Sequence, residues 1–213
     1  YYWCAIAQNA VGINYGTIVT FTTVALPTVV TQAASPVTST TATLNSSITP
    51  NGTSTTAWFR YSSTDPTSCN DTFGTRIPAS SGTFMGAGST AASNPLSISG
   101  LLPGNTYYFC AIAQNTIGTQ FGPLLSFTTP PQVPTVTTTP PTSLSATTGT
   151  FNGSANPNGS ATTAWFRFST ANPGVCNDAF GTRVPATGGT AIPFGNSPVA
   201  FSQAVTGLTT GTT

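Results

Sequence analysis

Gly100–Asn115 reads GLLPGNTYYFCAIAQN, and the same stretch occurs a second time in two parts. The chain ends with Gly207–Thr213, GLTTGTT, which matches the first half. It begins with Tyr1–Asn9, YYWCAIAQN, which matches the second half. Because the end runs into the beginning in this way, we expect the chain to be one period of a longer array, with Thr213 leading into another Tyr1.

The rest of the chain repeats with nearly the same spacing. Trp58 and Cys69 recur 107 residues later, and Tyr1 recurs 106 residues later, so the two offsets add up to the chain length of 213. A period of about 100 residues is too long for a solenoid and typical of domains in a row. We expect the last two strands of a split domain in 1–23, a complete domain in 24–131, and the first five strands of a second domain in 132–213. Residues 1–23 of the next copy would complete that second domain.

Short β-prone segments alternate with turn residues along each repeat. Thr56–Ser62 is rich in aromatic residues, Tyr107–Ala113 alternates, and Pro50–Gly52 reads as a turn between strands. No segment shows the apolar period of 3.6 residues that an amphipathic helix needs. The sequence therefore predicts an all-β protein built of β-sandwiches.

One segment carries a resemblance to a known family. Leu101–Tyr107, LLPGNTY, resembles the tyrosine corner of fibronectin type III-like domains. Pro50–Tyr61 and Pro157–Phe168 resemble bacterial secreted versions of these repeats. The resemblance implies tandem fibronectin type III-like (immunoglobulin-like) sandwiches, extracellular or at the cell surface. The second repeat departs from the pattern at Leu208–Gly211, which lacks the proline and is not followed by a tyrosine of its own.

The composition excludes several classes of function. Only 3% of the residues are charged and the net charge is +1, so the basic surface of a nucleic-acid-binding protein is absent. No run of 18 apolar residues predicts a membrane span. Without histidine or lysine, no serine or threonine has a general base beside it in the usual sense. We therefore expect no catalytic residue and no cofactor.

The four cysteines occupy equivalent positions in the repeats, which favours disulfides and an oxidising compartment. We expect Cys69 to bond Cys110 within the complete domain, and Cys176 to bond Cys4 of the adjacent copy. The alternative for Cys4 and Cys176 is two free thiols. A zinc site is disfavoured, because the chain has no CxxC motif and no histidine.

All charged side chains lie between the third expected strand and the loop after the cysteine: Arg60, Arg76, Arg167, Arg183, Asp65, Asp71 and Asp178. Asn70 and Asp71 near Arg76 suggest either a calcium or ligand site or a local Arg–Asp pair. So few acids do not form a tight calcium cage. The favoured interpretation is an Arg–Asp pair that orders the Cys69 loop, with no metal bound.

Strand alternation places a set of side chains on the outer face of one sheet: Trp58, Arg60, Tyr108, Ile112, Trp165, Arg167, Tyr2 and Ile6. Such a face stacks on sugars or packs against a neighbouring strand. In the alternative, Arg60 covers Trp58 or Tyr108 and the disulfide shields the rest. Asparagines in N-x-S/T triplets are candidate glycan acceptors: Asn45, Asn51, Asn70, Asn152 and Asn158.

The function expected from these features is structural: a repeat unit of an extracellular fibre whose partners are copies of itself, joined head to tail. The alternatives are an adhesin or carbohydrate-binding array, with surface glycans as partners, and a passive spacer of a larger secreted enzyme. The copies would follow one another in one giant chain or exchange strands between subunits. A third arrangement, in which the chain folds back on itself, is least favoured.

Overall fold

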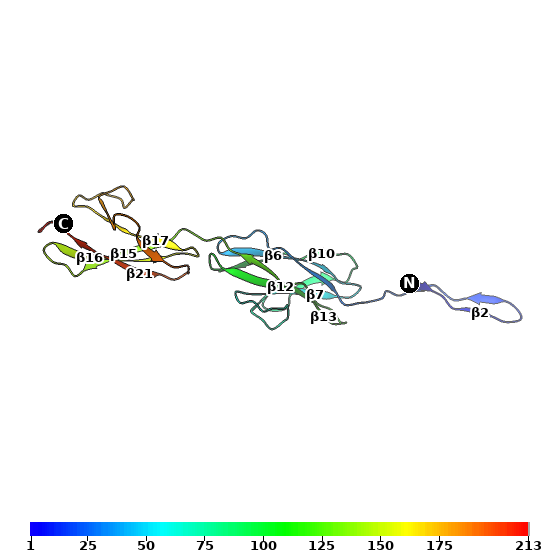
Figure 1. Ribbon diagram of the computed structural model, residues 1–213. Helices are drawn as coiled ribbons and strands as arrows, with labels where there is room; N and C mark the ends of the chain where they lie inside the picture. The colour runs from blue at the N-terminus through cyan, green and yellow to red at the C-terminus, as the bar shows by residue number, and fades with distance from the viewer. Residues whose placement is uncertain (213) are drawn as a thin grey trace. The chain divides into compact units, whose positions relative to one another are not determined.

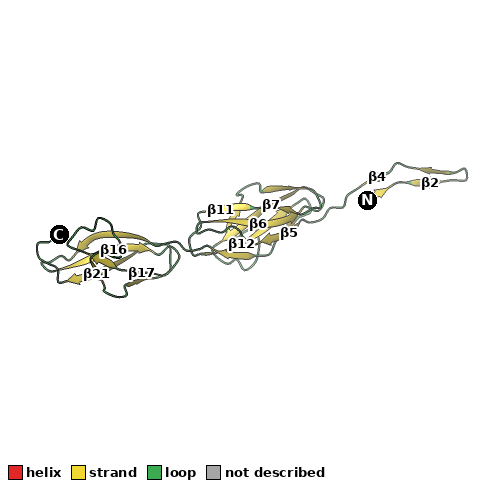
Figure 2. Cartoon of the chain, turned by 90° about the horizontal axis from the view of Figure 1, so that it is seen from above, coloured by secondary structure: helices red, strands yellow, loops and turns green. Residues whose placement is uncertain are grey.

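The computed structural model describes residues 1–212, and every regular element in that range is a β-strand (Figures 1 and 2). The all-β expectation is confirmed. Among the described residues there is accordingly no helix that would cross a membrane. The chain forms two compact units. The first comprises Tyr1–Pro36, Thr43–Ser97 and Tyr107–Phe127, and the second comprises Val37–Ala42, Ile98–Thr106 and the residues from Thr128 onward. The domain boundaries expected from the repeats stay a prediction.

A four-stranded sheet is built around a strand with strict alternation. It contains β5 (Thr28–Gln32), β6 (Thr41–Thr49), β10 (Ala92–Ser93) and β11 (Leu96–Ser99). The three other strands all pair with β6. Every second residue of β6 is buried, which is the pattern of a strand with one face on a core.

The second sheet of this part of the chain has six strands. It contains β7 (Thr55–Ser62), β8 (Thr75–Ile77), β9 (Thr83–Gly86), β12 (Thr106–Gln114), β13 (Thr119–Phe121) and β14 (Leu125–Thr128). Strands β7 and β12 are antiparallel neighbours at its centre. Ile48 of β6 packs with Ala57 of β7 and Ala113 of β12, so the two sheets share a core. This arrangement is consistent with a β-sandwich.

The outer face of the six-stranded sheet is covered. Trp58 is 5% exposed, and Cys110 and Ile112 are fully buried. These three side chains form a second apolar cluster, against which Cys69, Phe73 and Leu124 pack. Trp58 and Ile112 are therefore not available as an exposed interaction face, and this packing agrees with the alternative in which the disulfide shields them. Strand alternation places them correctly on the outer side, but the loop after β7 folds back over that side.

The N-terminal residues form an antiparallel hairpin that we call the N-terminal hairpin, residues 1–23. It contains β1 (Tyr2–Trp3), β2 (Ile6–Gln8), β3 (Ile13–Tyr15) and β4 (Val19–Thr20). Strand β1 pairs with β4, and β2 pairs with β3. All of its residues are exposed, although the segment is rich in aromatic and branched side chains. The hairpin is thus a folded element with no core beneath it.

The second unit contains one three-stranded sheet and two short strand pairs. The sheet is β15 (Thr135–Thr142), β16 (Thr148–Asn156) and β21 (Val199–Thr206), with β16 in the middle. The pairs are β17 (Thr162–Ala164) with β20 (Thr190–Ile192), and β18 (Phe166–Phe168) with β19 (Thr182–Val184). Its buried core consists of Ala155, Ala164, Ile192 and Phe201, with Phe166 packed against them.

Candidate functional site

Among residues 1–212, one edge of β18 has no paired strand. In the first repeat (24–131) the equivalent strand β7 pairs with β8 and β9 on one side and with β12 on the other. Within the described part of the chain, β18 pairs with β19 alone. The shared pairings have the same register, since Phe59 faces Ile77 in the first repeat and Phe166 faces Val184 in the second. Unpaired N–H and C=O groups along such an edge favour the addition of another strand.

An apolar groove, formed by Pro141, Leu144, Phe151, Phe166 and Phe168, lies beside this open edge. The groove contains two cavities, one of about 230 Å³ and one of about 520 Å³. Both cavities are lined by Pro141, Phe151 and Phe168. The ring of Phe151 is 5.9 Å from that of Phe166 and 5.4 Å from that of Phe168. In the first repeat the counterpart of Phe166, Phe59, is fully buried beside Phe109 of β12. The groove therefore exposes side chains that the first repeat covers with β12.

The N-terminal hairpin reproduces the pairing of β12 with β13 in the first repeat. Ile6 faces Tyr15 in the hairpin as Ile112 faces Phe121 between β12 and β13. The Gly16 N–H donates to the Ala5 carbonyl at 2.8 Å. The equivalent bond in the first repeat, from Gly122 to Ala111, has the same length of 2.8 Å.

The aromatic residues at the open end of the hairpin also match. The rings of Tyr1 and Phe21 stack with centres 5.1 Å apart and planes 20° apart. Their counterparts Tyr107 and Phe127 stack at 5.6 Å and 21°. The hairpin thus holds its aromatic pair in the arrangement that the first repeat uses inside its core.

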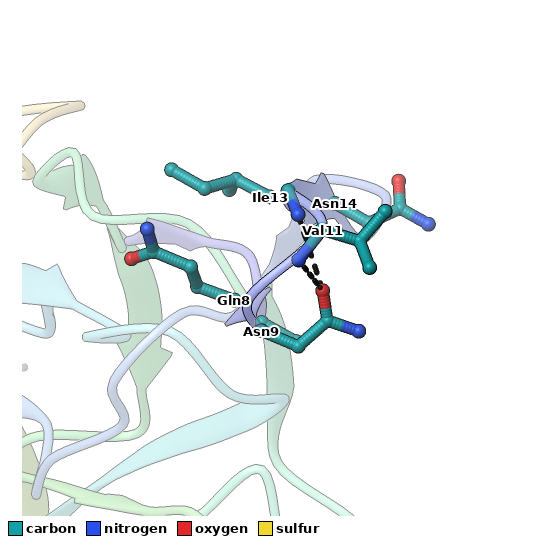
Figure 3. Close-up of a pocket in the computed structure, with 7 residues that line it drawn as sticks. Gln8, Asn9, Val11, Ile13 and Asn14 are labelled. Atoms are coloured by element: carbon teal, nitrogen blue, oxygen red, sulfur yellow. Dashed lines mark hydrogen bonds between the residues drawn. The ribbon is translucent and has the colours of Figure 1, made fainter.

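An asparagine shapes the turn of the hairpin (Figure 3). The Asn9 side-chain oxygen Oδ1 accepts hydrogen bonds from the N–H groups of Val11, at 2.8 Å, and Gly12, at 3.1 Å. Asn115 makes the same two bonds to the turn after β12. Such side-chain-to-backbone bonds stabilise a turn locally. Local bonds of this kind explain how the turn keeps its shape without a core.

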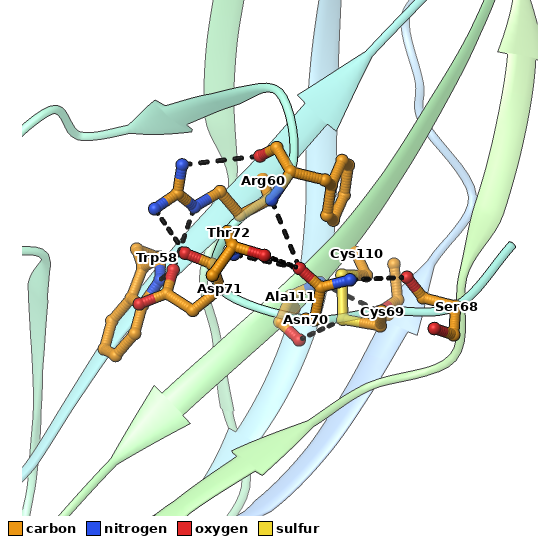
Figure 4. Close-up of a disulfide and its surroundings, with 11 residues drawn as sticks. Trp58, Arg60, Ser68, Cys69, Asn70, Asp71, Thr72, Cys110 and Ala111 are labelled. Atoms are coloured by element: carbon orange, nitrogen blue, oxygen red, sulfur yellow. Dashed lines mark hydrogen bonds and ion pairs between the residues drawn. A yellow bond between two sulfur atoms is a disulfide. The ribbon is translucent and has the colours of Figure 1, made fainter. Parts of the chain in front are cut away.

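A disulfide and a polar cluster hold the loop after β7 (Figure 4). Cys69 is bonded to Cys110 across 41 residues of sequence. The Asp71 carboxylate oxygen Oδ1 accepts from Trp58 Nε1 at 2.8 Å and from Arg60 Nε at 2.9 Å. The Arg76 guanidinium carbon lies 4.5 Å from the centre of the Trp58 ring, a cation–π contact.

The second repeat contains the same polar cluster without a disulfide. Asp178 accepts from Trp165 Nε1 at 2.9 Å and from Arg167 Nε at 2.7 Å. Arg183 stacks over Trp165 at 4.6 Å. Cys176 in this loop is an exposed free thiol, and so is Cys4 in the N-terminal hairpin. The polar cluster is therefore present in this loop without a sulfur bond.

Both carboxylates of these clusters have lowered pKa values. For Asp71, partial burial acts to raise the pKa, but the hydrogen bonds from Arg60 and Trp58 and the charges of Arg60 and Arg76 together outweigh it. For Asp178, the hydrogen bond from Arg167 is the largest influence and lowers the pKa, with Trp165 adding to it. Both groups are thus held in the charged form that the arginines require.

The expected Arg–Asp pair is present, although its partner is Arg60 and not the neighbouring Arg76. In the alternative in which Arg60 covers Trp58 or Tyr108, the structure differs at Trp58: Arg76 stacks on this ring, and Arg60 is held by Asp71. Among residues 1–212 no group of three or more His, Cys, Asp or Glu side chains would hold a metal ion.

Of the residues expected on the outer face of the sheet, Trp165 in the second repeat is 38% exposed, and Tyr2 and Ile6 in the hairpin are exposed.

Most of the candidate glycan acceptors use their amide nitrogen in the fold. Nδ2 donates to a backbone carbonyl within 3.0 Å in Asn45, Asn51, Asn152 and Asn158. In Asn70 the corresponding bond, to Ser68, is longer at 3.4 Å. Because glycosylation takes place at this nitrogen, Asn70, whose bond is the longest of the five, keeps its nitrogen the least engaged in the fold.

Thr31 is a further residue that joins the two sheets, and no sequence pattern predicts it. Its side chain is buried, and its hydroxyl oxygen Oγ1 accepts a hydrogen bond of 3.0 Å from the Ala111 N–H. This bond ties β5 to β12, strands of two different sheets. The only signal in the sequence is that a threonine recurs at the equivalent position, Thr138, and threonine is too common in this chain for that recurrence to stand out.

No known family model matches the chain, and no curated protein matches it. The candidate site has two complementary parts: the apolar groove with Cys176 in the second repeat, and the N-terminal hairpin with Cys4.

Proposed function

We propose that this chain is the structural repeat unit of an extracellular or cell-surface fibre, made of fibronectin type III-like sandwiches joined end to end. The observation that carries the proposal is complementarity. The second repeat exposes an apolar groove beside an unpaired strand edge, and residues 1–23 form a hairpin equivalent to the β12–β13 pair that fills this place in the first repeat.

In this fibre, the hairpin of one copy completes the second repeat of the next. Strand addition satisfies the backbone groups along the open edge of β18, and the aromatic residues of the hairpin cover the groove. The contact joins two different surfaces, so it does not close on itself and continues as a filament. The joint has the same geometry whether a peptide bond links the copies or separate subunits meet there.

The remaining features of the chain suit a structural role. A disulfide in a buried setting fits an oxidising, extracellular environment. The burial of Trp58 and Ile112 in the first repeat favours packing over display, and this observation disfavours the adhesin alternative.

Assembly of the 213-residue chain tests the proposal, with electron microscopy and analytical ultracentrifugation as the measurements. Trp3 is 57% exposed in the hairpin, whereas its counterpart Phe109 is fully buried. Trp3→Asp therefore leaves the single chain folded but places a charge in the core of the joint. We expect filaments from the wild-type chain and single chains from the variant.

Val11→Asp is the matched control, because Val11 lies in the turn and is 95% exposed, and its counterpart Ile117 is exposed in the first repeat. This variant should assemble like the wild type. If the wild-type chain stays single at all concentrations, or if Trp3→Asp assembles equally well, the proposal is wrong.

A further inference from the structure

We propose that Thr138 and Cys176 of the second repeat bind the N-terminal hairpin of a second copy in the apolar groove and fix it in one register. In this register the Thr138 hydroxyl accepts a hydrogen bond from the Ala5 N–H, and Cys176 forms a disulfide with Cys4. The inference rests on the proposed function and specifies the site at which the copies join.

The first repeat supplies the template for the hydrogen bond. The Ala111 carbonyl accepts a hydrogen bond from the Gly122 N–H, and the Ala111 N–H donates a hydrogen bond to the Thr31 hydroxyl. Gly122 leaves room for this contact, because a Cβ at that position would collide with Thr31 Oγ1. Thr31 thus fixes Ala111 as the residue of β12 that lies against β5.

The corresponding residues of the joint have the same identities. Thr138 stands where Thr31 does, and Ala5 and Gly16 stand where Ala111 and Gly122 do. Thr138 lines the smaller cavity of the apolar groove together with Phe151 and Phe166. Within the hairpin, the Ala5 carbonyl already accepts from Gly16. A slip by one residue would turn every hairpin side chain to the wrong face, so a single acceptor at this point selects the register.

A second polar contact supports the same register at the turn of the hairpin. The Asn115 amide nitrogen Nδ2 donates to the carbonyls of Ala25 and Pro50, at 2.7 and 3.3 Å. The equivalent acceptors for Asn9 of an incoming hairpin are the carbonyls of Gln132 and Pro157. These two carbonyls belong to residues other than Thr138 and bind the turn of the hairpin. Together with Thr138 they therefore hold the hairpin at two separate points.

The cysteines follow from this register. Arg60 faces Cys110 between β7 and β12, so Cys4 comes to lie opposite Arg167. The loop that carries Cys176 is already ordered by Asp178, as the loop of Cys69 is by Asp71. Two thiols and one oxidised glutathione then give the Cys4–Cys176 disulfide and two reduced glutathione molecules. The bond forms by thiol–disulfide exchange through a mixed disulfide.

The test uses the full chain, prepared once with natural nitrogen and once with heavy nitrogen, mixed and assembled in a glutathione redox buffer. Non-reducing peptide mapping by mass spectrometry identifies the cross-linked peptides. We expect Cys4–Cys176 pairs in which one peptide is light and the other heavy. Such mixed pairs arise only between two copies.

The register contact is tested with Thr138→Val, which keeps the shape and removes the acceptor. The chain concentration needed for half-maximal assembly should rise by roughly tenfold to a hundredfold, since one buried N–H loses its partner. Thr137→Val is the matched control, because the first repeat has Val30 at that position, and it should assemble like the wild type.

The outcomes separate this inference from the proposed function. Filaments that contain Cys4–Cys4 or Cys176–Cys176 pairs, or in which Thr138→Val assembles as well as the wild type, overturn the register and leave the fibre proposal standing. If every cross-linked pair of peptides is entirely light or entirely heavy, the hairpin in the groove does not come from a second copy, and the inference is wrong on this point. Absence of any assembly overturns both proposals.

Discussion

Asp71 joins two residues of β7 to the loop that carries Cys69. One carboxylate oxygen accepts from both Trp58 and Arg60, and Arg76 covers the face of the same tryptophan. The loop is thereby held over the outer side of the sheet, where it buries the disulfide. The same three contacts recur around Asp178 in a loop without a disulfide, which indicates that they help to hold the loop.

The lowered pKa of Asp71 predicts a dependence of stability on pH. A carboxyl whose pKa is lower in the folded state stabilises the fold above its ordinary value of about 3.8, and this contribution is lost as the pH falls through the folded pKa. We expect the first repeat to lose thermal stability below about pH 4. In Asp71→Asn this loss should be smaller, as followed by circular dichroism during heating.

Asp65→Asn is the control for this experiment. Asp65 lies in the same loop, and within the described residues it pairs with no arginine. Its substitution should leave the pH response of the first repeat unchanged. An identical acid response of Asp71→Asn and the wild type would show that the ion pair does not stabilise the fold.

The residues of this cluster mark the limit of sequence-based prediction. Periodicity correctly assigned Trp58 and Cys110 to one side of a sheet, and repeat logic paired Cys69 with Cys110. The alternative in which the disulfide shields this side agrees with their burial, but the path of the loop over the outer face leaves no period in the sequence. The usable signal was chemical, because six of the seven charged side chains in the chain contribute to the cluster around one tryptophan in each repeat.

At the scale of strands, nearly identical sequences differ in structure according to their neighbours. Thr55–Ser62 forms the single continuous strand β7, whereas the equivalent residues in the second repeat form β17 and β18, interrupted at Trp165. Strand β7 has β12 along its other edge, and β18 has no such partner among residues 1–212. The sequence predicts the strand, but its continuity depends on a partner that local sequence does not specify.

This difference predicts a change in hydrogen exchange on assembly. When a hairpin pairs with the open edge, β17 and β18 should join into one strand, and amides of 162–168 should gain protection. Hydrogen-exchange mass spectrometry of single and assembled chains measures this gain. Residues 55–62 serve as the internal reference, because their partner β12 is present in every copy. Equal exchange of 162–168 in both states would contradict pairing at this edge.

At the scale of the whole molecule, the two repeats differ in how completely their cores are covered. The first repeat buries Phe59 and Phe109 fully and closes its loop with a disulfide. The second repeat leaves Phe151, Phe166 and Phe168 partly exposed. The all-β class and the disulfide were predictable from the spacing of turns and cysteines. The groove was predictable only as a missing pair of strands, since its shape depends on side-chain packing.

The first repeat should depend strongly on its disulfide. Cross-linking residues 41 apart stabilises a fold by about 4 kcal/mol in the chain-entropy description. We expect Cys69→Ala with Cys110→Ala to lower the free energy of unfolding by about that amount, measured by denaturant titration at a concentration where the chain is single.

Cys4→Ala with Cys176→Ala is the matched control, because both thiols are free and exposed in the single chain. Its free energy of unfolding should stay within about 0.5 kcal/mol of the wild type. If the two double variants behave alike, the bridge contributes nothing to the stability of the single chain.

The bridge between Cys69 and Cys110 has a further consequence when the ends of a repeat are pulled apart. Residues between two bonded cysteines do not lengthen the chain even after every strand has come loose, so 41 residues are withheld from extension. At roughly 3.4 Å for each extended residue, this shortens the released length by about 140 Å per repeat. In the proposed fibre, an overloaded repeat would yield by a short, fixed step and keep its neighbours connected.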